Sequence, residues 1–128
     1  MSSYLHAELS EVIIKAFYRV YNTLGYGFLE KVYENSLLIE LRKAGLTAEA
    51  QRPIKVYYDK VEVGFYIADI IIDEKIIVEL KAAESLQEEH EAQLLNYLRA
   101  TNIEVGLLMN FGKKAEVKRK VFSNSYKK

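Results

Sequence analysis

The chain has 128 residues, half of them hydrophobic, which suits one folded domain with a proper core and argues against disorder. Its 18 basic and 18 acidic residues cancel, which excludes a uniformly cationic nucleic-acid coat protein and an acidic solvating tail. Cysteine is absent, so disulfides and thiolate metal sites are excluded, and a cytoplasmic location is expected. No apolar run approaches the roughly 18 residues of a membrane span, and the first residues do not resemble a signal peptide.

The zero net charge hides an uneven distribution. Residues 113–128 hold seven basic residues against one acid, a net +6, so the rest of the chain sums to −6. We expect a single domain over residues 1–128 whose basic C-terminal segment, 113–128, holds a nucleic-acid backbone electrostatically. A solvated, partly frayed tail is the alternative. The candidate contact residues are Lys113, Lys114, Lys118, Arg119 and Lys120.

The first part of the chain has helical periodicity. Apolar residues recur at steps of three and four over about 4–22, which predicts a helix. A glycine loop follows at Gly25–Gly27, and a second helix is expected over about 29–44, with Gly45 just past its end. The apolar face of the first helix, in so small a domain, favours a homodimer.

The period then changes to that of strands. Strands are expected at 54–58, 61–73, 75–82, 103–110 and, on the sheet edge, 116–122, with a helix at about 86–100. The middle strands are apolar on both faces, which is typical of strands covered on two sides. The order α-α-β-β-β-α-β-β allows a parallel crossover around the third helix, so an α/β fold with a mixed sheet flanked by helices is predicted.

Three charged residues interrupt these apolar strands: Asp69, Glu79 and Lys81. A buried carboxylate costs several kcal/mol unless it is paired, protonated or bound to metal. If residues 73–75 form the loop of a hairpin, position 72 faces 76 and Asp69 faces Glu79, with Lys81 on the same face of its strand. Two carboxylates beside a lysine make a natural site for a hard divalent cation. A buried salt bridge is the alternative, and a one-residue slip would move Asp69 to the other face.

One residue pair and one single acid accompany these charges. Gln93 and Tyr97 lie four apart on the predicted third helix and therefore share a face, where Gln93 is either a ligand-positioning group or a polar seam residue. Glu30 opens the second helix, where it is either part of the site or an ordinary first-turn acid stabilised by the helix dipole. His6 and His90 are too isolated to form a zinc site.

These residues resemble a known pattern. The Asp69 … Glu79-Leu80-Lys81 arrangement is similar to the signature of the PD-(D/E)xK nuclease superfamily, and the predicted element order resembles its restriction-endonuclease-like α-β-β-β-α-β core. The spacing of Gln93 and Tyr97 resembles the Gln-x-x-x-Tyr motif of the RecB-like branch. The stretch GFLEKVY at 27–33 resembles the motif of the small prokaryotic GxxExxY family, and the resemblance covers about residues 8–122. Ala68 stands where the superfamily name calls for proline, which is not a ligand.

The resemblance implies a Mg²⁺-dependent nuclease, Mn²⁺ being a possible substitute, that hydrolyses phosphodiester bonds of nucleic acid, with DNA the favoured substrate. Asp69, Glu79 and the backbone carbonyl of Leu80 would hold the cation, and Glu30 would complete the carboxylate set or orient a water. Lys81 would orient the attacking water or neutralise charge on the phosphate. Gln93 would position a ligand from behind, and Tyr97 would pack beside it.

Two other functions stay open. A nuclease-like fold can serve as a non-catalytic nucleic-acid-binding or assembly module, because fold alone does not carry function. The chain can also be a plain structural domain whose buried charges are ion pairs. No membrane association is expected in any of the three cases.

Overall fold

The computed structural model describes residues 5–127. The expected helix start at residue 4, the signal-peptide assessment of residues 1–4 and Lys128 of the basic segment lie outside this range. Within it, the elements follow the predicted order. They are α1 (Ala7–Leu24), α2 (Glu30–Lys43), β1 (Ala48–Tyr58), β2 (Val61–Ile72), β3 (Ile76–Lys81), α3 (Glu88–Arg99), β4 (Val105–Phe111), β5 (Ala115–Val121) and the short 3-10 turn η1 (Asn124–Tyr126).

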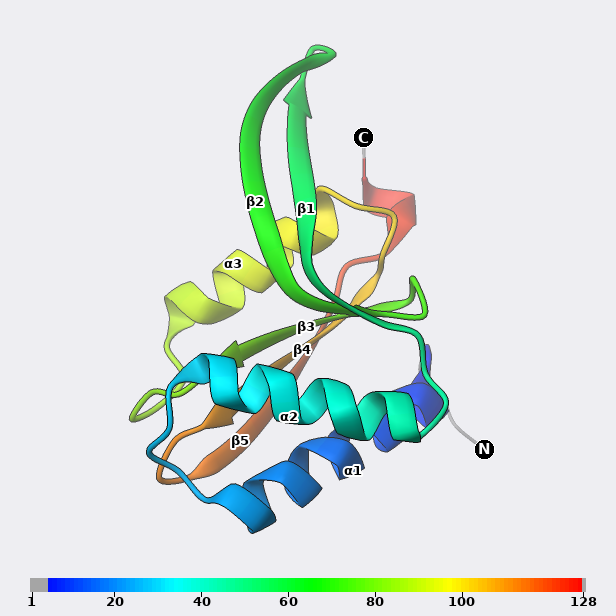
Figure 1. Cartoon of the computed structure of the whole chain (residues 1–128). Coiled ribbons are helices and arrows are strands. Elements are labelled where there is room, and N and C mark those ends of the chain that lie inside the picture. Colours follow the sequence, from blue (N-terminus) through cyan, green and yellow to red (C-terminus); the bar gives the residue numbers. More distant parts are fainter. Residues whose placement is uncertain (1–4, 128) are drawn as a thin grey trace.

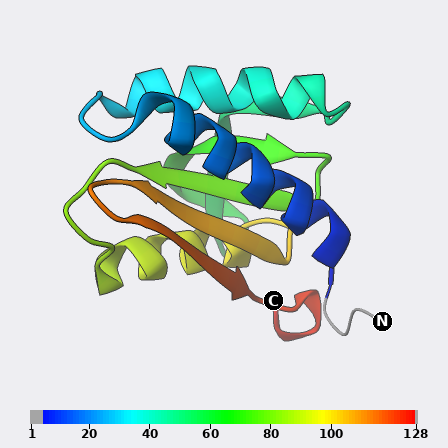
Figure 2. The ribbon, with the colours of Figure 1, turned by 90° about the horizontal axis from the view of Figure 1, so that it is seen from below.

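The five strands form one mixed sheet in the order β1-β2-β3-β4-β5. β3 and β4 are parallel, and every other neighbouring pair is antiparallel. The parallel pair is joined by the crossover helix α3, as an α/β fold requires. Helices α1 and α2 cover one face of the sheet and α3 covers the other (Figure 2). This arrangement is consistent with a restriction-endonuclease-like fold.

Two apolar clusters fill the layers on either side of the sheet. The larger one holds Ile13 and Phe17 of α1 together with Leu37 of α2 and the sheet residues Ile70 and Val78. The smaller one lies under α3. Most of the apolar face of α1, which suggested a homodimer surface, is therefore buried in the core of this chain, and Val12 of that face stays 38% exposed.

Strand β1 is longer than its alternating pattern predicts, because it begins at Ala48 rather than near Ile54. The reason is an irregular residue, Gln51, whose φ of 55° breaks the alternation between Ala50 and Arg52. Beyond this point the β1–β2 hairpin bends and projects away from the rest of the sheet (Figure 1). Its tip is the Asp59–Lys60 turn, where both residues have positive φ, as a tight hairpin turn demands.

The loop between β3 and α3 is tied to β4 by one buried side chain. Asn110 is fully buried, accepts the backbone N–H of Ala83 at 2.9 Å and donates to its carbonyl oxygen at 2.9 Å. The contact is close: a Cβ on Gly112 would lie 2.0 Å from the Ala83 oxygen, so only glycine fits there. This clasp fixes the chain immediately after Lys81.

We predict that Asn110→Ala lowers the free energy of unfolding by about 2–3 kcal/mol, because it leaves the N–H and C=O of Ala83 without partners in a part-buried loop. Urea unfolding followed by circular dichroism measures the change. Asn35→Ala, on the exposed side of α2, is the control and should shift stability by less than about 0.5 kcal/mol. Equal effects of the two substitutions would contradict the clasp.

Candidate functional site

Asp69 and Glu79 lie opposite each other, as the count from the hairpin turn predicts. Ile72 pairs with Ile76 and Ile70 with Val78, so the next residue along each strand, on the opposite face of the sheet, brings the two carboxyls together. The side chains take part in the strand pairing themselves. The N–H of Asp69 donates to Oε2 of Glu79 at 2.8 Å, and the N–H of Leu80 donates to Oδ2 of Asp69 at 2.8 Å.

Burial makes this pair electrostatically unfavourable. Glu79 is only 5% exposed, and burial together with the charge of Asp69 raises its pKa to about 8. Burial also raises the pKa of Asp69, with further contributions from the charges of Glu34 and Glu30. Lys81, at the end of β3, opposes both shifts but does not cancel them. The pair therefore binds a proton readily, and a cation could replace that proton.

Glu30 is positioned by the glycine loop and the tyrosine that follows it. The fully buried Tyr33 donates its hydroxyl hydrogen to the carbonyl oxygen of Gly25 at 2.6 Å and accepts the N–H of Phe28 at 3.2 Å. The Tyr33 ring stacks on Phe111, with centroids 4.3 Å apart. The loop is thereby fastened to the core, and the first residue of α2, Glu30, lies where its charge acts on both Asp69 and Glu79.

Sequence reasoning missed a fourth carboxylate, Glu34. It lies one helical turn after Glu30, is 4% exposed, and adds to the charge felt by Asp69. Its oxygens are held by Lys31 at 2.8 Å and by the side-chain amide of Gln51 at 2.7 Å. The available signal was an acid on the apolar stripe of α2 between Tyr33 and the leucines that follow it.

Gln51 connects this acid to the bend of the hairpin. In regular pairing Gln51 would face Asp69, but its positive φ turns the strand at that point. Residues two apart on a regular strand point to the same face, but at this bend they do not. Ile70 belongs to the cluster under α1 and α2, whereas Ala68 belongs to the cluster under α3. Asp69 therefore lies at a corner, open to α2 on one side and to α3 on the other.

Helix α3 brings Tyr97 to the carboxylate pair. Burial, then the charges of Glu79 and Asp69, raise the pKa of Tyr97 to about 12. Its ring lies 5.7 Å from the ring of Tyr66 on β2. Gln93 is on the same face of α3 one turn earlier and is half-buried, but within residues 5–127 no hydrogen bond joins its side chain to the carboxylates.

The basic candidates lie apart from these carboxylates, on β5 and the turn before it. Lys113 and Lys114 are exposed in that turn. Lys118 and Lys120 both form ion pairs with Glu91 of α3, at 2.8 Å and 2.5 Å, and these contacts lower the pKa of Glu91 to about 2. Arg119 donates to the carbonyl oxygen of Leu5 at 2.8 Å. Part of the basic charge therefore holds α3 and the segment just before α1 to the sheet.

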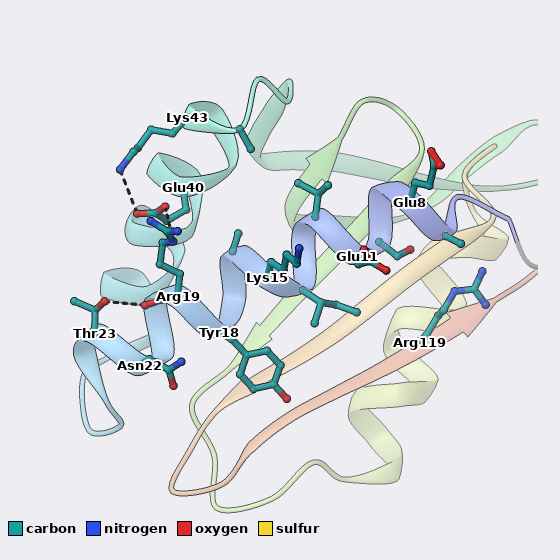
Figure 3. Close-up of a pocket in the computed structure, with 16 residues that line it drawn as sticks. Glu8, Glu11, Lys15, Tyr18, Arg19, Asn22, Thr23, Glu40, Lys43 and Arg119 are labelled. Atoms are coloured by element: carbon teal, nitrogen blue, oxygen red, sulfur yellow. Dashed lines mark hydrogen bonds and ion pairs between the residues drawn. The ribbon is translucent and has the colours of Figure 1, made fainter. Parts of the chain in front are cut away.

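A hollow on the surface lies away from the carboxylates. It is a shallow groove over α1 and the end of α2, with Glu8, Glu11, Lys15, Arg19 and Glu40 around it (Figure 3). None of the four carboxylates described above lines this groove.

The carboxylates Asp69 and Glu79 could provide part of the ligand shell of one hard cation, but not a complete shell. Among residues 5–127, no three His, Asp or Glu side chains are grouped closely enough to hold a metal by themselves. Asp69 and Glu79 each use one carboxylate oxygen to accept a backbone N–H, which leaves the second oxygen of each for another partner. Mg²⁺ is usually held by one or two protein carboxylates with waters completing its shell, so a pair suffices.

The described helices do not include one long and apolar enough to span a bilayer.

Comparison with known proteins agrees with this arrangement. No curated protein matches the chain significantly in sequence. The crystal structure of SSO0001 matches with a TM-score of 0.59 and 21% identity, over 92% of this chain and 60% of that one. The chain thus spans about three-fifths of that protein's length, and at this identity the likeness concerns the fold alone. A family model described as the PD-(D/E)XK nuclease superfamily matches residues 7–120, nearly the whole chain. The chain therefore belongs to the PD-(D/E)XK nuclease superfamily.

Proposed function

We propose that this protein is a divalent-metal-dependent nuclease that hydrolyses phosphodiester bonds of nucleic acid, with DNA as the favoured substrate and Mg²⁺ or Mn²⁺ as the cation. The observation that carries the proposal is the facing pair Asp69 and Glu79, of which Glu79 is buried; burial first, and then neighbouring negative charge, raise the pKa of both carboxyls. Members of the superfamily usually use divalent metal ions. A bound cation would supply a nucleophilic water at neutral pH and stabilise charge on the phosphate.

Individual residues of the chain have separate roles in this proposal. Asp69, Glu79 and the carbonyl oxygen of Leu80 hold the cation, and the Leu80 N–H fixes one Asp69 oxygen so that the other is free to bind. Lys81 lies beside both carboxylates, where its ammonium group neutralises charge on the phosphate or orients the attacking water.

The two flanking helices support these groups. Glu30 completes the carboxylate set from the start of α2. Gln93 orients a ligand from α3, and Tyr97 packs behind the pair. Lys113, Lys114, Lys118, Arg119 and Lys120 contribute a salt-sensitive hold on the nucleic-acid backbone.

The finer family assignment belongs to the same proposal. Tyr33 closes the glycine loop and so places Glu30, which gives the GxxExxY-like stretch a physical role in the site. The Gln93–Tyr97 spacing on α3 supports placement in the RecB-like branch. With this family assignment, we further propose that the protein comes from a prokaryote and is located in the cytoplasm.

A second candidate is a non-catalytic nucleic-acid-binding or assembly module. It is favoured by the fact that, in the part of the chain described, the carboxylates are too dispersed for three of them to hold a metal together. The two candidates differ in whether cleavage accompanies binding.

We predict metal-dependent cleavage of labelled nucleic acid that Asp69→Asn and Lys81→Met each reduce at least about a hundredfold, because each removes a charge that acts in the transition state. Gel assays with single-stranded and duplex DNA and RNA, in Mg²⁺, Mn²⁺ or EDTA, measure it. The matched controls are Asp59→Asn and Lys75→Met, exposed turn residues of the same types, which should retain full activity. Binding without cleavage in every metal would favour the second candidate instead.

We predict that, without metal, stability falls as the pH rises. The pKa of Glu79 is about 8 in the folded chain against an ordinary 4.5, so between these values the folded state binds a proton that the unfolded state has lost. The free energy of unfolding should decrease across this window by on the order of 3 kcal/mol, and millimolar Mg²⁺ should restore most of it above pH 8.

Thermal unfolding at pH 5 to 9, with and without Mg²⁺, tests this prediction. Glu79→Gln should flatten most of the pH slope and remove the metal response. Glu74→Gln, in the exposed β2–β3 turn, should keep both, because Arg52 lowers the pKa of Glu74 rather than raising it. Metal stabilisation that survives in Glu79→Gln would contradict a cation at this pair.

A further inference from the structure

The distal half of the β1–β2 hairpin exposes an unusual amount of apolar surface. Beyond the bend at Gln51 it projects as a two-stranded ribbon (Figure 1). We call its large exposed apolar residues the ribbon patch; their exposed fractions run from 44% for Ile67 to 75% for Tyr58. The ribbon patch consists of Tyr57, Tyr58, Val61, Val63, Phe65 and Ile67.

Within residues 5–127, one face of the ribbon packs against α3. Ile54 and Ala68 belong to the cluster under α3, and Tyr66 touches Tyr97 of that helix. Phe65 and Ile67 alternate with Tyr66 along β2, so they face away from α3. In the part of the chain that the structure describes, both long edges of the ribbon also lack a neighbouring strand, because β1 is the outer strand and β2 pairs with β3 only from Ile70 to Ile72.

The size of the ribbon patch matches an interface. Tyr57 and Tyr58 are consecutive in β1 and point to opposite faces, so one face of the ribbon holds the ribbon patch without Tyr57. With ordinary areas for these residues, the exposed fractions on that face amount to roughly 550 Å², at the upper end of the 300–600 Å² of the largest patch on a typical monomer. Two such surfaces give roughly 1,100 Å², which exceeds the roughly 1,000 Å² expected of a specific interface. An isolated two-stranded ribbon is marginally stable in water, so coverage would also stabilise it.

The charges on the ribbon argue against nucleic acid as the occupant. Arg52 is bonded to Glu74 and Glu49, and Lys55 lies 3.8 Å from Glu62. The remaining charged residues, Asp59 and Lys60, cancel in the tip turn. A nearly neutral surface that is rich in valine, isoleucine and tyrosine offers little to phosphates but does not repel an identical surface.

We propose that the ribbon patch is the surface through which two copies of this chain associate, ribbon against ribbon about a two-fold axis. A second copy supplies an apolar surface of equal size in a one-to-one ratio. We therefore place the dimer surface on the ribbon and not on α1. The main apolar residues of α1, such as Ile13 and Phe17, are buried in the core. The outward face of α1 exposes part of Val12 and Tyr18 among the charged residues Glu8, Glu11, Lys15 and Arg19 (Figure 3).

Sedimentation equilibrium of the full chain tests the proposal. The wild type should sediment as twice its 14.8 kDa mass at micromolar concentration, and Phe65→Glu should weaken dimerisation at least thirty-fold, because it places a charge in the apolar contact. Ile39→Glu, an equally exposed apolar residue on α2, is the control and should leave the dimer intact. A wild type that stays monomeric at about 100 μM overturns the proposal, as does equal disruption by both substitutions.

Cross-linking gives a second measurement that does not depend on a destabilising variant. Because the chain has no cysteine, a single introduced thiol can pair only with its copy. Val63→Cys should form a covalent dimer under mild oxidation at low protein concentration, whereas Ile39→Cys should not. Equal, slow cross-linking of the two variants overturns the proposal. A monomer whose nucleic-acid binding is lost in Phe65→Glu also overturns it and assigns the ribbon to nucleic acid. None of these outcomes depends on whether the chain is a nuclease.

Discussion

Two carboxylates facing each other across an antiparallel strand pair, inside an otherwise apolar sheet, are the constraint on which the rest of this structure depends. The strands around Asp69 and Glu79 are apolar on both faces because helices cover both faces. That covering removes water from the carboxyls and raises the pKa of Glu79 to about 8. A fold optimised for stability alone would place an apolar pair here, since burying like charges costs free energy. The cost is tolerable where a bound cation removes it.

The bend at Gln51 makes the pair accessible. If β1 and β2 continued straight, the face of β2 that carries Asp69 would lie wholly under α3. Instead, the side chains of Ala68 and Ile70 point to opposite sides of the sheet, and Asp69 between them is open toward the start of α2. Glu34 holds the bend through the Gln51 amide and contributes charge to the site at the same time. One buried acid thus serves both the backbone geometry and the electrostatics, so its substitution alone would not separate the two roles.

The sequence predicts the local features of the site better than its long-range contacts. Alternation and the turn at 73–75 are enough to place Asp69 opposite Glu79, because strand register follows from turn length. The contacts of Glu34 with Gln51 and of Asn110 with Ala83 join residues 17 and 27 positions apart, and no periodicity encodes them. The start of β1 was missed for a related reason: a non-glycine residue at positive φ breaks the alternation by which strands are recognised. The basic segment shows the same limit, since its charge was apparent but the pairing of Lys118 and Lys120 with Glu91 was not.

These contacts also change the meaning of the zero net charge. Two basic residues of β5, Lys118 and Lys120, form ion pairs with Glu91. Lys81 only partly offsets the negative charge of the carboxylates around it. The zero net charge therefore does not mean that every charge is neutralised by a neighbour. The region around Asp69 and Glu79 has more acidic than basic groups, and Lys113 and Lys114 are exposed at the β4–β5 turn. If the proposed function holds, a polyanion would approach the carboxylates most readily once a cation had neutralised them. Metal binding and nucleic-acid binding would then be coupled, each strengthening the other by the same factor.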